Sequence, residues 1–168
     1  CRVLKVKNPI LTNLDLIKIR GMQVKGMKVS TLSMLYDKKT PLKDAIEHLY
    51  VQADQAHQDG ATILVLSDRG VDQEHMAIPS LLAVSALQQY LVKTRKNTAV
   101  SIIVETAEPC EVHHFATLLG FGASAVNPYL ALDTLYELIG TGVLDKDYSQ
   151  ACKDYIHAVV SGIVKIAS

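Results

Sequence analysis

The segment Ala61–Leu66, ATILVL, is a continuous apolar run that follows Gly60 and ends at a polar loop beginning with Ser67. A run of this kind is typical of a strand that is buried on both faces, as in a parallel sheet. Before it, apolar residues recur at spacings of three and four from Leu42 to Ala56, which predicts an amphipathic helix. The fold class follows from this pairing of a helix with a buried strand.

The same alternation continues on both sides of this segment. We expect further strands at Lys28–Leu35, Val100–Glu105 and Ala123–Val126. Thr40 is placed to cap the helix before Gly60, with Pro41 at its first position. Other helices are expected at Ser80–Lys93, from Glu108-Pro109 through Leu119, from Asn127-Pro128 to Ile139, and from Tyr148 onward.

Alternating strands and helices with apolar strands predict an α/β fold, a parallel (βα)4 unit with right-handed crossovers. Four such units suit half of a (βα)8 barrel, and they equally suit a small open doubly wound sheet. The pattern leaves both architectures open. The final segment has apolar residues at Cys152, Ile156, Val159 and Ile163, which predicts an additional C-terminal amphipathic helix.

Composition excludes several classes of protein. The 168 residues are enough for one domain, and they are 49% apolar and 20% charged. Seventeen Lys and Arg balance seventeen Asp and Glu, and there is no basic run, so no nucleic acid or anionic membrane partner is expected. No apolar stretch approaches 18 residues, so no membrane span is expected.

Three scattered cysteines form neither a disulfide framework nor a metal motif, which favours a reducing, cytoplasmic location. Cys1 could be an N-terminal nucleophile, but we interpret it as a fragment boundary.

The residues that follow the predicted strands are the candidate site. In either architecture the carboxyl ends of the strands share one rim, where functional groups gather. The candidates are Ser67, Asp68, Arg69, Glu105 and Asn127. They could form a catalytic or binding rim, or a polar network in which Asp and Asn cap helices and Arg69 pairs with a neighbouring aspartate, Asp68 or Asp72. We favour the network.

Other motifs assign no chemistry. Gly120 and Gly122 precede a predicted strand, whereas phosphate-binding glycines follow one, and no GxGxxG is present. His113 and His114 are adjacent on a predicted helix and point about 100° apart, so they cannot share a metal ion. We therefore assign no catalytic, cofactor-binding or metal-binding residue.

Two long stretches carry a specific resemblance. Gly60–Val92 and Val104–Leu135 closely resemble the central domain of the large subunit of glutamate synthase, and Asn8–Ile19, NPILTNLDLIKI, is similar to the start of that region. The likeness covers nearly the whole chain. It implies a reduced relative of the FMN-type (βα)8 barrel, which favours the half-barrel. It also implies a lead-in segment at 1–27, a (βα)4 core at 28–140 and a C-terminal linker helix at 141–168.

The resemblance also implies a function. In this family the central domain connects a glutaminase domain and an FMN synthase domain of the same polypeptide, and helps wall the tunnel that carries ammonia between them. The whole enzyme makes glutamate from glutamine and 2-oxoglutarate. These two domains are therefore the expected partners, and residues 141–168 would lead toward the FMN synthase domain.

The resemblance assigns no active site to this chain. FMN and the 3Fe–4S cluster belong to parts of the family that the chain lacks, and Cys1 does not match the glutaminase nucleophile. The isolated chain is expected to be inactive. It is also expected to self-associate, through its edge strands or through the apolar stripe of its last helix. The alternative is a small (βα) enzyme or an anion-binding module that uses Asp68, Arg69 and Glu105.

Overall fold

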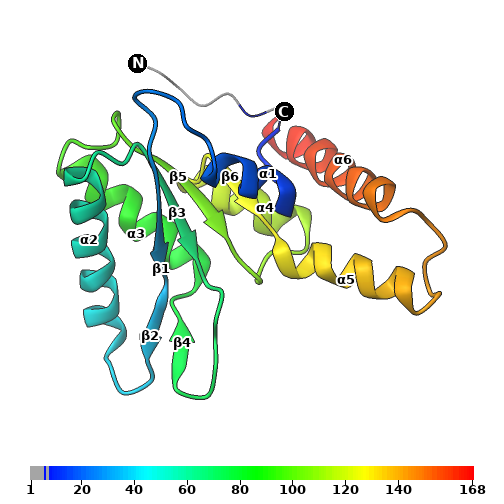
Figure 1. The fold of residues 1–168 in the computed structure, drawn as a ribbon, viewed down its shortest axis with the longest axis horizontal. Coiled ribbons are helices and arrows are strands. Elements are labelled where there is room, and N and C mark those ends of the chain that lie inside the picture. The colour runs from blue at the N-terminus through cyan, green and yellow to red at the C-terminus, as the bar shows by residue number, and fades with distance from the viewer. Residues whose placement is uncertain (1–5, 7) are drawn as a thin grey trace.

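The structure is a computed structural model that describes residue 6 and residues 8–168; Cys1 lies outside the described residues. Helices and strands alternate through most of this length (Figure 1). The helices are α1 (Asn13–Arg20), α2 (Leu42–Gln58), α3 (Ser80–Lys93), α4 (Val112–Gly120), α5 (Tyr129–Gly140) and α6 (Tyr148–Ala167). The strands are β1 (Val29–Ser33), β2 (Leu35–Asp37), β3 (Ile63–Ser67), β4 (His75–Ala77), β5 (Ser101–Glu105) and β6 (Ala125–Asn127).

Four strands form one parallel sheet in the order β1-β3-β5-β6. The order rises with the sequence and does not reverse within this sheet. The predicted α/β class and the parallel sheet are therefore confirmed. The register aligns Ser33, Ser67, Glu105 and Asn127 across the four strands, so their last residues lie at one end of the sheet.

Each face of the sheet carries its own core. On one face, Leu64, Leu66 and Val104 pack with the buried sides of α2, α3, α4 and α6. On the other face, Val65 and Ile103 pack with α1 in a smaller core. Alternate residues of β3 thus enter opposite cores, which explains why its sequence is an uninterrupted apolar run.

Two surfaces that were expected to be exposed are covered wholly or in part. Pro9 and Leu11 exchange backbone hydrogen bonds with Val126, so the lead-in segment pairs with the edge of β6. The apolar side of α6 packs on α4, and its Cys152 and Ile156 are buried. The first part of the stripe is therefore covered within the chain, whereas Val164 and Ile166 near the end of α6 remain exposed. Among the described residues, β1 remains an unpaired edge of the parallel sheet.

The structure also corrects local predictions. The predicted strand at Lys28–Leu35 is interrupted at Met34, whose backbone bonds with Ser67 and Ile78 instead. After it, β2 pairs antiparallel with β4, beyond the carboxyl ends of β1 and β3 (Figure 1). The sequence pattern predicted only loops there, because each strand has three residues.

Two predicted helix starts were placed too early. Pro41, not Thr40, occupies the N-cap position of α2, and no side chain caps that end. The helix predicted from Glu108-Pro109 begins at Val112. Glu111 is the N-cap of α4, and Glu108 lies in the loop before it, where its carboxylate accepts the Ser80 N–H at the start of α3.

Candidate functional site

The carboxyl ends of β3, β5 and β6 bring the candidate residues together, because parallel strands end at the same edge. Ser67, Glu105 and Asn127 are the last residues of these strands, and Asp68 follows directly. All four are buried, whereas Arg69 remains exposed. Polar groups buried at this density need internal partners.

Glu105 is the centre of the first network. Its carboxylate accepts hydrogen bonds from both terminal nitrogens of Arg20, at 3.2 and 3.0 Å, and from Ser67 Oγ at 2.6 Å. Arg69 Nε lies 3.0 Å from Glu105 Oε2. Burial alone would raise the pKa of Glu105, but the bonds from Arg20, Ser67 and Arg69 outweigh burial and lower this pKa. The carboxylate is therefore held ionised between two cations.

Asp68 is the centre of the second network. Its Oδ2 accepts from Thr106 Oγ1 at 2.7 Å and from the Ala107 N–H at 3.0 Å. Its Oδ1 accepts from Tyr129 Oη at 2.6 Å. Thr106 Oγ1 also lies 2.8 Å from Ser80 Oγ, so this network extends to the start of α3.

Arg69 joins the two networks. Its guanidinium pairs with Glu105 and also lies over the ring of Tyr129, 3.9 Å from the ring centre. The expected pairing of Arg69 with Asp68 or Asp72 is wrong: Asp68 binds Thr106, Ala107 and Tyr129, and Asp72 binds His75. The difference arises because β5 places Glu105 beside Ser67.

Asn127 ties the lead-in segment to the sheet. Its Nδ2 donates to the Leu11 carbonyl and to Asn13 Oδ1, both at 3.0 Å. Its Oδ1 is buried and has no hydrogen-bond partner among the described residues. A buried acceptor in this state is uncommon in proteins.

Two important residues of this rim were missed by sequence reasoning, Arg20 and Tyr129, whereas Thr106 was expected at the strand end together with Glu105. Arg20 lies in the last turn of α1, 85 positions from Glu105, and no local pattern links the two. Tyr129 lies near a candidate, after β6. Its position after a strand end was the available signal.

His113 and His114 lie in the first turn of α4, as expected. His114 Nδ1 accepts the Cys110 and Glu111 N–H groups, at 3.2 and 3.4 Å, so the imidazole is turned back toward the loop before its own helix. Within the described part of the chain, no group of three or more His, Cys, Asp or Glu residues is arranged to hold a metal ion. No helix there is long and apolar enough to cross a membrane.

The rim chemistry is thus that of an internal polar network. Glu105 and Asp68 each have three or more donors, and these come from α1, the strand ends and α5. Fold and site together define a parallel α/β domain whose strand-end charges hold its own elements in place.

The family follows from comparison with known proteins. All of residues 1–168 match the sequence model of the glutamate synthase central domain, and the chain belongs to that family. It is 38% identical over 167 residues to the glutamate synthase [NADPH] large chain of Bacillus subtilis, covering 99% of this chain and 11% of that protein. It is 33% identical to the glutamate synthase [NADH] of Schizosaccharomyces pombe, covering 100% and 8%. It is 36% identical to a ferredoxin-dependent glutamate synthase of Synechocystis, covering 99% and 12%.

These relatives are much longer than the chain, which spans between 8% and 12% of their length. They include NADPH-, NADH- and ferredoxin-dependent proteins, at similar identities to this chain. The likeness therefore assigns the domain and does not distinguish the electron donor.

Proposed function

We propose that this domain connects the glutaminase and FMN synthase domains of a glutamate synthase polypeptide, helps wall the ammonia tunnel between them, and has no active site of its own. The observation that carries the proposal is that the two buried acids of the rim have all their hydrogen bonds within the chain. Glu105 and Asp68 are the buried acids at the strand ends, and both are fully used in binding other parts of the chain. A general acid or base needs a proton site within reach of a substrate, and these bonds occupy that site.

The strand order supports a half-barrel origin for the fold. Neighbouring strands of a (βα)8 barrel follow one another in sequence, as β1, β3, β5 and β6 do here, and the helices α2, α3 and α4 share one core. In a doubly wound sheet the strand order reverses at a switch point. We take the domain as a (βα)4 relative of the FMN barrel, with α1 lying on the face that corresponds to the barrel interior.

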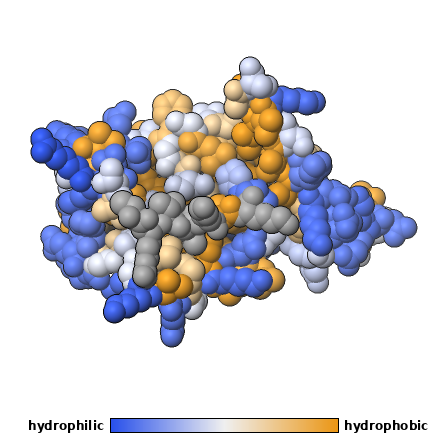
Figure 2. Space-filling view, turned by 90° about the horizontal axis from the view of Figure 1, so that it is seen from above, coloured by the Kyte–Doolittle hydropathy of each residue, from blue (hydrophilic) through white to orange (hydrophobic). Residues whose placement is uncertain are grey.

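Exposed apolar side chains support the connecting role. Leu14 and Ile17 of α1 are 58% and 63% exposed, although Leu16 and Ile19 of the same helix are buried. The apolar residues of α1 therefore extend beyond its buried side, and exposed apolar surface of this kind is often an interaction surface. Figure 2 shows the molecule from above, on the side of the amino ends of the strands, and hydrophobic residues form patches there between hydrophilic ones. Other domains of the polypeptide would cover such surfaces.

The alternative, an anion-binding module or a small enzyme at the rim, has less support. Arg69 already pairs with Glu105 through Nε and lies over the Tyr129 ring, so an anion would compete with the Glu105 carboxylate for the same guanidinium. No cofactor is proposed for this chain; FMN and the 3Fe–4S cluster are assigned to other parts of the polypeptide.

Two assays test the proposed function. The isolated chain is expected to bind no FMN and to release no ammonia from glutamine. FMN binding or ammonia release above a buffer control would show that the chain has a site of its own. In a full-length glutamate synthase that carries this domain, Glu105→Gln removes the ion pairs that hold α1 and the strand ends together. It should lower glutamate formation from glutamine more than formation from added ammonium, because added ammonium does not have to pass this domain. Equal loss with both nitrogen sources would contradict the connecting role. Glu47→Gln, on the exposed side of α2, is the matched control.

A further inference from the structure

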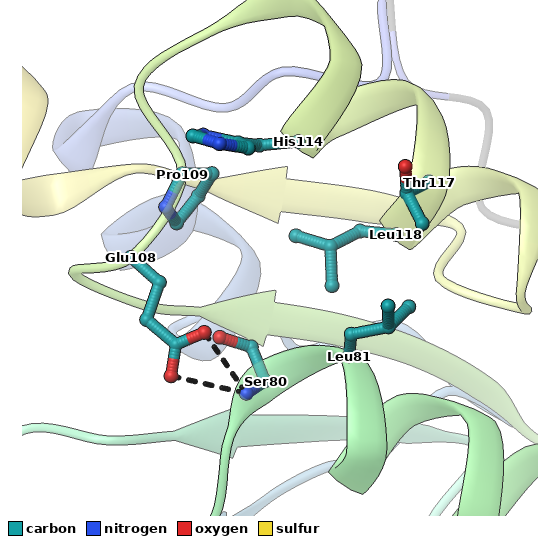
Figure 3. A pocket seen from close by; sticks show the side chains of 7 residues that line it. All are labelled: Ser80, Leu81, Glu108, Pro109, His114, Thr117 and Leu118. Atoms are coloured by element: carbon teal, nitrogen blue, oxygen red, sulfur yellow. Dashed lines mark hydrogen bonds between the residues drawn. The ribbon is translucent and has the colours of Figure 1, made fainter.

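A small pocket borders the Asp68 network at Ser80 and lies between α3, α4 and the loop that joins β5 to α4. It has a volume of about 220 Å³. Ser80 and Leu81 of α3, Glu108 and Pro109 of the loop, and His114, Thr117 and Leu118 of α4 line it. In Figure 3, Leu81 and Leu118 point toward each other on one side, and Glu108 lies with Ser80 on the other.

The size of the pocket limits its occupant. Cofactors and substrates of drug size generally occupy pockets of about 300–1,000 Å³. A pocket of 220 Å³ suits one long side chain or a small molecule of similar size. Leu81 is 38% exposed, so an alkyl chain in the pocket would remove apolar surface from water.

The charge of the pocket selects a cation. Glu108 is exposed, and no Lys, Arg or His among the described residues lies within salt-bridge distance of it. Both of its oxygens accept the Ser80 N–H, at 3.1 and 3.2 Å, which fixes the carboxylate in place and occupies the N-terminus of α3. An anion would meet this carboxylate and find that helix end already filled.

His114 is held by the loop before its helix. Its Nδ1 accepts the backbone N–H groups of Cys110 and Glu111, so this nitrogen is not available to an occupant of the pocket. The pocket therefore combines one fixed negative charge with an apolar wall. Lys and Arg side chains match this combination, because they bury an alkyl stem and keep a charged head at a polar edge.

We propose that this pocket receives a Lys or Arg side chain from another domain of the same polypeptide, with the stem between Leu81 and Leu118 and the cationic head on Glu108. The occupant is assigned to the same polypeptide because about nine tenths of the length of each relative lies outside the matched region. This inference rests on the proposed connecting function and names one contact point of that role.

The first test uses the 168-residue chain and n-butylguanidinium as the probe. Titration followed by amide NMR shifts should show saturable binding, on the order of millimolar, with shifts confined to Ser80–Leu82 and 108–118. Pentanoate, with a similar alkyl chain and the opposite charge, should not bind. Glu108→Gln should weaken the cation about fivefold, as expected for one partly exposed ion pair, and Leu81→Ala should also weaken it. Glu47→Gln, which is exposed on α2, should bind as the parent chain does.

Several outcomes overturn the proposal. Three results would each refute cation binding in this pocket. They are amide shifts scattered over the surface, equal binding of pentanoate, and an unchanged affinity in Glu108→Gln at an unchanged unfolding temperature. The second test measures hydrogen exchange at Ser80–Leu82 in the full-length polypeptide; faster or equal exchange relative to the isolated chain would refute the assigned occupant. Neither result depends on the nitrogen-source assay, so failure here is distinguishable from failure of the proposed function.

Discussion

Replacing Glu105 by Gln should destabilise the domain by about 2 kcal/mol, because it removes the charge that holds two arginines. The carboxylate has four donors: two nitrogens of Arg20, Nε of Arg69, and Ser67 Oγ. Hydrogen bonds to charged groups contribute about 1.5–3 kcal/mol, and neutral ones about 0.5–1.5. Glu105 is 4% exposed, but the side chains of Arg20 and Arg69 are 33% and 47% exposed, so water compensates part of each loss. We therefore expect a loss of about 1 kcal/mol in the free energy of unfolding for each of the two arginines.

Urea unfolding followed by circular dichroism measures this loss. In thermal unfolding of a domain of this size, a loss of about 2 kcal/mol corresponds to a fall of about 4–8 °C in Tm. Glu47→Gln, at an exposed position of α2, should change stability by less than about 0.5 kcal/mol. If Glu105→Gln loses no more stability than this control, the ion pairs of Glu105 with Arg20 and Arg69 do not stabilise the fold.

The pH dependence gives a second check on the same residue. Burial opposes ionisation of Glu105, but its partners dominate and lower its pKa below the ordinary value of 4.5. A lowered folded-state pKa stabilises the fold above the unfolded-state pKa, and this contribution is lost as pH falls through the folded-state pKa. The stability difference between parent and Glu105→Gln should therefore be largest near pH 7 and should shrink as the pH falls below 4.5 and through the folded-state pKa of Glu105. If the stability difference between the two proteins stayed constant as the pH falls, the pKa of Glu105 would not be lowered in the folded state.

The remaining predictions concern packing, Tyr129 and association. Gly162→Ala should cost about 1 kcal/mol despite its better helix propensity, because its Cβ would lie 2.6 Å from Val112 Cγ2, and adding Val112→Ala should recover the loss in thermal unfolding. Tyr129→Phe should cost about 1–3 kcal/mol by leaving Asp68 Oδ1 without its donor. Burial first, and Asp68 second, raise the pKa of Tyr129 well above 10.0. The pKa values of Tyr90, Tyr148 and Tyr155 are raised too, so alkaline absorbance titration should show several late tyrosines in the parent and one fewer in this variant. Light scattering at micromolar concentration should detect dimers that form through the unpaired edge of β1; a monomer of 18.4 kDa would count against this.

Much of the architecture could be predicted from local patterns. The apolar run at Ala61–Leu66 predicts a strand buried on both faces, and the structure places its alternate residues in two separate cores. The candidate rim also followed from the sequence, since parallel strands must end at one edge. Resemblance in long segments identified the family. These features depend on residue types within one element and its neighbours.

Other features required the tertiary structure. The pairing of Glu105 with Arg20 joins residues 85 positions apart, and the bond between Asp68 and Tyr129 joins residues 61 positions apart. Arg69 pairs with Glu105, not with an aspartate nearby in sequence, because strand register decides which side chains meet. Local sequence periodicity determined where strands and helices form, whereas the partners of the buried charges were decided by the order and register of the strands.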